Sequence, residues 1–154
     1  MGRGLLRLAP LALMALAACQ PARPDAPAVK DAWVRLSPVA GRPAAAYFTV
    51  EGGAQADRLV AVESPRVGRI ELHEGGMADG MMTMRPIDGA DVPAGGTVAF
   101  APGGNHAMLF DVAADVKPGG TLPLTFRFRS GKAVNVDAAT RAAGDAAPGG
   151  HAGH

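Results

Sequence analysis

Cysteine is nearly absent from this sequence, because its 154 residues contain only Cys19. A Cys-x-x-Cys pair for thiol chemistry is therefore excluded. The Gly-x-Ser-x-Gly sequence that surrounds the nucleophile of α/β-hydrolases is also missing. These absences argue against an enzyme that relies on a thiol or a serine nucleophile.

An excess of charge of one sign is lacking as well, since 15 Lys and Arg face 14 Asp and Glu in interspersed order. Nucleic-acid binding, which needs clustered positive charge, is not predicted. Aromatic residues make up only 5%, and 21 Gly and 13 Pro could suggest disorder. However, 48% hydrophobic residues in alternating runs are too many for a disordered chain. The composition predicts one folded domain.

The N-terminus has the pattern of a secretory signal. Residues 1–8 carry two arginines and no acid, and residues 8–18 are apolar but too short to span a membrane as a mature helix. The run ends in Leu16-Ala17-Ala18-Cys19, which resembles the lipobox of bacterial lipoproteins. We therefore expect residues 1–18 to be a lipoprotein signal peptide and Cys19 to be acylated. The alternative is an ordinary signal with an accidental cysteine.

Localisation and domain boundaries follow from this reading. Gln20, rather than Asp, follows the cysteine, which in Gram-negative lipoproteins indicates the outer membrane, on its periplasmic side. Residues 19–29 contain three prolines and are predicted to be an extended tether. Residues 30–140 are expected to form the folded domain. Residues 141–154 hold no bulky apolar residue and are predicted to be a flexible tail.

The folded domain is predicted to be all-β, as an antiparallel sandwich or Greek-key barrel. Apolar residues alternate with period two, and glycine pairs at 52–53, 75–76, 95–96, 103–104 and 119–120 interrupt the runs. No long stretch has helical periodicity with caps. The nine expected strands are 32–36, 45–51, 58–63, 69–73, 82–87, 97–101, 107–112, 122–129 and 133–138.

Histidines and methionines gather in one window of this domain, which contains His73, Met77, Met81, Met82, Met84, His106 and Met108. Period-two alternation places His106 and Met108 on one face of a strand. His73 ends a second strand and Met84 lies in a third, so we expect these four side chains to converge at one end of the fold. The alternative is that the histidines are hydrogen-bonded structural residues and the methionines fill the core.

Two imidazoles and two thioethers form a soft, neutral donor set that favours copper(I) over zinc, calcium or magnesium. A blue-copper site needs a cysteine thiolate, and Cys19 is expected to be acylated. Met77, Met81 and Met82 are interpreted as loop residues rather than ligands, with a flexible lid or a transient copper contact as the alternatives. Glu74 and Asp79 are hard donors that suit copper(I) poorly, so we expect them to be solvated.

The spacing His73-x10-Met84-x21-His106-x-Met108 matches the signature of the periplasmic copper chaperones called PCu(A)C. The surrounding segments are similar to that family too, over about residues 30–138. They are Asp31-Ala-Trp-Val-Arg35, Ala46-Tyr-Phe-Thr49, Glu71-Leu-His-Glu74, Met82-Thr-Met-Arg-Pro86 and Gly103-Gly-Asn-His-Ala-Met108. The chain is identified by this resemblance as a candidate member of the family.

The resemblance implies a cupredoxin-like β-barrel that binds one copper(I) through His73, Met84, His106 and Met108. It also implies delivery toward the copper A centre of cytochrome c oxidase, with that subunit or another copper carrier as partner and with no enzymatic activity. Copper sequestration for tolerance, without a specific acceptor, is the alternative. Related chaperones often have His- or Met-rich tails, so His151 and His154 are candidates for a weaker, auxiliary copper(II) site.

Overall fold

The computed structural model describes residues 22–147, and all regular secondary structure within them is β. The ten strands are β1 (Ala28–Arg35), β2 (Ala44–Glu51), β3 (Asp57–Glu63), β4 (Val67–Ala78), β5 (Met81–Ile87), β6 (Ala90–Val92), β7 (Thr97–Phe100), β8 (His106–Val112), β9 (Thr121–Phe128) and β10 (Ala133–Arg141). The all-β prediction is confirmed. This described part contains no helix long and apolar enough to cross a membrane.

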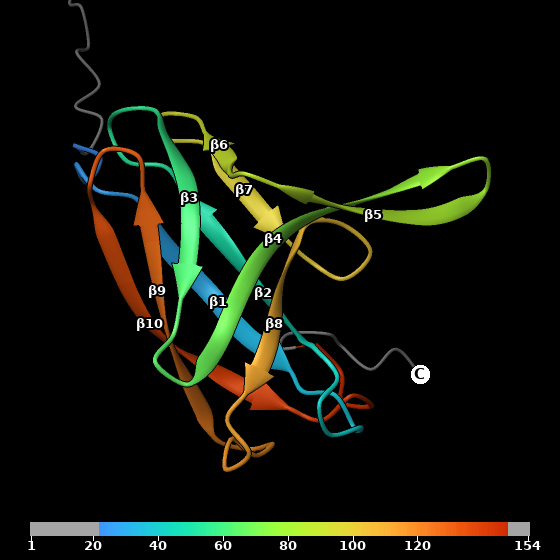
Figure 1. Cartoon of the computed structure of the whole chain (residues 1–154). Helices are drawn as coiled ribbons and strands as arrows, with labels where there is room; N and C mark the ends of the chain where they lie inside the picture. Colours follow the sequence, from blue (N-terminus) through green and yellow to red (C-terminus); the bar gives the residue numbers. More distant parts are fainter. Residues whose placement is uncertain (1–21, 148–154) are drawn as a thin grey trace, which may run out of the picture.

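The strands form one sheet in the order β5-β4-β8-β2-β1-β10-β9-β3-β6, and β7 pairs additionally with β2. All pairings are antiparallel except that between β1 and β10. Figure 1 shows the sheet wrapping around a common core, so that β3 lies near β4 as well as β9. The β4–β5 hairpin is the exception, because its far end projects away from the body (Figure 1).

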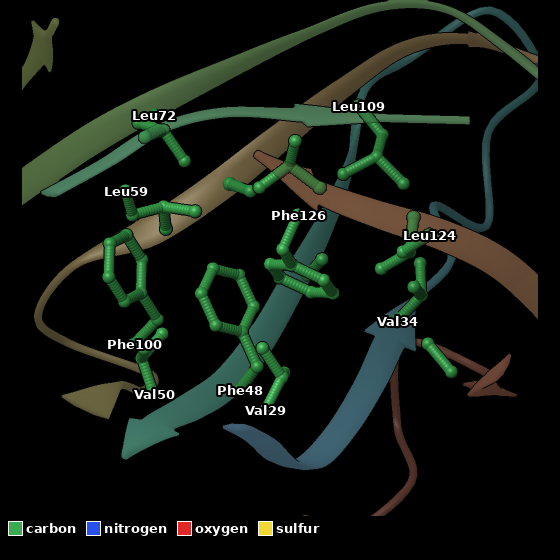
Figure 2. Close-up of a cluster of buried hydrophobic side chains, with 14 of the residues drawn as sticks. Val29, Val34, Phe48, Val50, Leu59, Leu72, Phe100, Leu109, Leu124 and Phe126 are labelled. Atoms are coloured by element: carbon green, nitrogen blue, oxygen red, sulfur yellow. The ribbon is translucent and has the colours of Figure 1, made fainter. Parts of the chain in front are cut away.

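The core is formed by side chains from the inner face of the sheet (Figure 2). Phe48 of β2 stacks on Phe100 of β7 at 4.4 Å between ring centroids and meets Phe126 of β9 edge-on at 4.7 Å. Buried and less buried residues alternate along β9, as the period-two pattern predicts. The outer face of β4, β5 and β8 therefore remains available for other chemistry.

Strand boundaries differ from the expected ones where local backbone breaks the pattern. β1 begins at Ala28 rather than at residue 32, because a bulge between Lys30 and Trp33, with Asp31 at φ 52°, interrupts the alternation. β6 was not predicted, since a strand of three residues is too short to show a period. The glycine pair at 75–76 does not form a turn and lies inside β4.

The β4–β5 hairpin turns instead at Asp79 and Gly80, with φ values of 52° and 76°. Positive φ at both central residues of a two-residue turn defines the I′ type, and Asp-Gly is among its preferred sequences. This turn fixes the register of the whole hairpin, from Ala78 opposite Met81 to Leu72 opposite Ile87.

The folded domain begins earlier and ends later than the sequence analysis expected. The predicted tether 19–29 overlaps β1, and the Pro24 carbonyl accepts a hydrogen bond of 2.9 Å from the Ala54 amide, so the final residues of that segment pack on the body. The apolar Val29, 9% exposed, accounts for this. At the other end β10 continues to Arg141, the first residue of the predicted tail. The signal peptide, Cys19, His151 and His154 lie outside the described residues.

The packing of Phe48 predicts a large effect of truncation. Phe48→Ala should lower the free energy of unfolding by about 3–5 kcal/mol, because a fully packed aromatic ring leaves a cavity. Val60→Ala, on the exposed side of β3, is the control and should change it by less than about 0.5 kcal/mol. Urea denaturation measures both values, and equal effects of the two substitutions would contradict this account of the core.

Candidate metal centre

His73 and His106 face each other across two adjacent strands. In the antiparallel pairing of β4 with β8 they are direct partners, and their ring centroids lie 5.6 Å apart with 39° between the planes. Their neighbours Leu72 and Ala107 are buried in the core, at 5% and 0% exposure. Because successive side chains of a strand point to opposite faces, both imidazoles lie on the outer face of the sheet.

Met108 lies on the same outer face of β8 as His106, two residues further along the strand. It pairs with Glu71 on β4 and with Ala45 on β2. The small side chain of Ala45 leaves space beside the half-buried thioether. The strand alternation predicted for this residue pair is thus present in the structure.

Met84 is on the edge strand β5, opposite Gly75, and two residues before Pro86, which is opposite His73. This spacing puts Met84 on the same face as His73. Pro86 lacks an N–H group, which is tolerated on an edge strand. The structure therefore brings all four expected residues to one face of three adjacent strands, with Met84 as the exposed member at 63%.

The hydrogen bond of His106 fixes which ring nitrogen is available. His106 Nδ1 lies 2.9 Å from the carbonyl oxygen of Gly104. A carbonyl can only accept, so Nδ1 carries the proton in the neutral ring and the Nε2 lone pair is free. The residue is only 8% exposed, so its orientation is restrained by packing as well.

In His73 the other ring nitrogen, Nε2, makes the hydrogen bond. Its Nε2 lies 3.1 Å from Oε2 of Glu71, and because the carboxylate accepts, Nε2–H is the donor. Nδ1 is buried without a hydrogen-bond partner among the described residues. A buried ring nitrogen without a partner is costly unless something else binds it. A metal ion satisfies such a lone pair, and the carboxylate–histidine pair is the usual support of a metal-binding imidazole.

Glu71 is a functional candidate that the sequence analysis did not identify. Its other oxygen forms an ion pair of 2.6 Å with Arg69, whose guanidinium lies 4.2 Å from the ring centre of Phe110. Arg69, Glu71 and His73 follow one another at every second position of β4 and so share its outer face. A carboxylate two residues before the histidine on an expected strand was the available signal.

A cavity of about 300 Å³ connects the site with the loop before β8. Its lining includes Met82, Met84, His106, Met108, Gly75, Gly103, Gly104, Pro43, Ala44, Ala45 and Tyr47. A Cβ atom on Gly75 would come within 2.6 Å of the Gly104 oxygen, so only glycine permits this close approach. Gly75 thus allows the loop that orients His106 to lie against β4.

The donor set is soft rather than acidic. No group of three or more His, Cys, Asp or Glu residues is arranged to hold a metal within residues 22–147. Glu74 forms an ion pair with Arg85 on the opposite face of the hairpin, and Asp79 is in the turn. Glu74 is therefore partly exposed and paired with Arg85.

Comparison with known proteins identifies the family. Residues 27–140 match the family described as "LpqE-like: Putative lipoprotein LpqE-like". The chain belongs to the LpqE-like family. It is also 32% identical over 113 residues to "Putative lipoprotein Lxx21020" of Leifsonia xyli subsp. xyli (strain CTCB07), covering 73% of this chain and 68% of that one.

Several solved structures, a PCuAC domain among them, have the same fold as this LpqE-like chain. The copper-bound PCuAC domain from PmoF2 is 26% identical with a TM-score of 0.62, covering 75% of this chain and 92% of that one. Apo-DR1885 from Deinococcus radiodurans is 29% identical with a TM-score of 0.57, covering 92% and 97%. CuI-DR1885 is 28% identical with a TM-score of 0.54, covering 81% of each chain. The cupredoxin-like fold class is confirmed.

The two hydrogen bonds predict opposite tautomers for the two neutral imidazoles. Nitrogen-15 NMR of the metal-free protein should show the Nε2–H form for His73 and the Nδ1–H form for His106. Glu71→Ala should convert His73 to a tautomer mixture and leave His106 unchanged, because only His73 contacts that carboxylate. Glu74→Ala is the matched control and should alter neither ring. Finding the same tautomer at both histidines would overturn this assignment.

Proposed function

We propose that this LpqE-like protein is a copper(I) carrier that binds one ion through His73, Met84, His106 and Met108. The observation that carries the proposal is the orphaned Nδ1 of His73 beside a preoriented His106, on the face that also holds two thioethers. The two rings offer different nitrogens, Nδ1 of His73 and Nε2 of His106. Their supports are a carboxylate and a backbone carbonyl respectively.

The chemistry of the donors supports copper(I) as the cargo. Thioethers are soft ligands that select copper(I), whereas zinc sites use thiolates, more imidazoles or carboxylates. All four donors are neutral. The affinity of the site for copper(I) therefore does not depend on the ion neutralising a buried negative charge. The copper-bound PmoF2 domain, at 26% identity, supports copper as the cargo, and CuI-DR1885, at 28% identity, supports copper(I).

The exposure of Met84 supports a carrier rather than a closed store. At 63% exposure this side chain is accessible on an edge strand, whereas His106 is 8% exposed. An incoming ligand from an acceptor can displace an exposed thioether first, while the histidines still hold the ion. We therefore propose delivery toward the copper A centre of cytochrome c oxidase, directly or through another copper carrier.

The location of the protein is part of the proposal. The lipoprotein descriptions of the family and of the Leifsonia relative support acylation of Cys19 and a membrane-anchored, periplasmic position. Placement in the outer membrane rests on Gln20. The tail histidines, His151 and His154, are proposed as a separate and weaker copper(II) site, because copper(II) prefers nitrogen donors to thioethers.

Competition with a copper(I)-specific chelator tests the site. The wild type should bind one tight equivalent, and His106→Ala or Met108→Leu should lower its affinity by about tenfold or more, since each removes one donor. Met81→Leu, at an exposed methionine on the opposite face of the hairpin, is the control and should bind as the wild type does. Unchanged affinity in both site variants would show that copper is held elsewhere.

The same preparations distinguish a carrier from a sequestering protein. Copper(I)-loaded protein should transfer its ion to an apo copper A domain faster than the ion dissociates into a chelator-free buffer. A protein that holds copper only for tolerance would transfer no faster than it releases. That second outcome would mean that the copper A domain is not the acceptor, but it would leave the assignment of the copper site unchanged.

A further inference from the structure

The β4–β5 hairpin exposes methionines in a way that core packing does not explain. The exposed large apolar side chains of residues 22–147 are two valines, Val39 and Val60, and four methionines. All four methionines, Met77, Met81, Met82 and Met84, belong to this hairpin, with exposures from 62% to 71%. The hairpin extends beyond the body of the protein (Figure 1), so these thioethers do not fill gaps in a core.

The register of the hairpin sorts these methionines by face. Met77 is directly opposite Met82, and Met84 is two residues after Met82 on the same strand. Met77, Met82 and Met84 therefore share one face, which is also the face of His73. Met81 is opposite Ala78 and points to the other side. The structure thus separates three aligned thioethers from a fourth that is equally exposed.

The aligned methionines are close enough to act together. Directly opposite residues of an antiparallel pair have Cβ atoms about 4.5–5.5 Å apart, and same-face neighbours along a strand are about 7 Å apart. Methionine has three rotatable bonds, so its sulfur adapts readily to a shared ligand. No carboxylate or ammonium group occupies this face of the hairpin between His73 and the turn, as the residues there are Gly75, Met77, Met82 and Met84.

This row of thioethers is continuous with the candidate metal centre. Met82 and Met84 line the same cavity as His106 and Met108. Met77, opposite Met82, extends the row toward the tip of the hairpin. Soft donors therefore run from the exposed tip to the two imidazoles without interruption.

We propose that Met77, Met82 and Met84 form a second, outer copper(I) site through which the ion enters and leaves the inner site. The inference rests on the proposed function, because Met84 is shared with the inner site. Met84 belongs to the outer site only while the inner site is empty, and once the inner site is filled the outer ion is held by Met77 and Met82, which are direct cross-strand partners. The outer site has only thioether donors and is weaker than the inner one, which adds two imidazoles. An ion bound there is exposed to an acceptor and is passed inward or outward by exchange of one thioether at a time, with no change of oxidation state.

Silver(I), a redox-inert soft ion, is the probe for this site. The purified full chain, carrying methyl-13C methionine, is titrated and followed by NMR. The first equivalent should shift the methyl signals of Met84 and Met108, and a second, weaker equivalent should shift Met77 and Met82 while Met81 stays unchanged. The double substitution Met77→Leu with Met82→Leu should abolish the second equivalent and leave the first within twofold. Met81→Leu should retain both.

Leucine keeps the apolar surface and removes only the sulfur, so a surface that merely docks an apolar partner would not respond to this change. Chelator capture of copper(I) gives a second readout, which should slow at least threefold in the double variant and not in Met81→Leu. A wild type that binds one equivalent, with that equivalent lost in His106→Ala, keeps the proposed function and overturns the outer site. A wild type that binds no soft ion overturns both.

Discussion

The antiparallel register of β4 with β8 is the constraint on which the site depends. It places His73 directly opposite His106 and Glu71 directly opposite Met108. A slip of β4 by one residue relative to β8 would turn His73 into the core and bring Leu72 to the surface, and a slip of β8 would do the same to His106 and Ala107. Burial of those apolar residues therefore fixes the position of the polar ones. The pairing of β4 with β8 thus places apolar residues on the inner face of the sheet and the candidate ligands on its outer face.

Support for the two imidazoles comes from different parts of the chain. Glu71 on the same strand orients His73, whereas the Gly104 carbonyl in the preceding loop orients His106. Gly75 brings the two histidines' supports together, because the absence of its side chain lets the loop that contains Gly104 approach β4. In the proposed copper(I) site, the packed His106 and the supported His73 would hold the ion on one side, while the exposed Met84 would leave it accessible on the other. That asymmetry suits a protein that binds copper and then gives it up.

Sequence patterns predicted most of the fold and the grouping of the four candidate ligands on neighbouring strands, but not the hydrogen bonds that orient the two histidines. Alternation is clean in β9, which buries one face, and β2, β8 and β9 were all found with nearly correct ends, although β2 and β8 also bury successive residues. β1 was shortened by the bulge at Asp31, and β4 was ended too early because Gly75 and Gly76 look like a turn. The role of Glu71 depends on side-chain geometry within one face, which alternation does not specify. Met77 and Met82 were interpreted as loop residues, and for Met77 the reason is that β4 was ended at residue 73.

The central claim is that two imidazoles and two thioethers of the body hold copper(I). X-ray absorption spectroscopy of the protein loaded with one equivalent of copper(I) tests it most directly, because nitrogen and sulfur neighbours scatter differently. The account predicts two nitrogen and two sulfur donors, with one sulfur lost in Met108→Leu and one nitrogen lost in His106→Ala. A first shell without sulfur, or one unchanged by both substitutions, would contradict it.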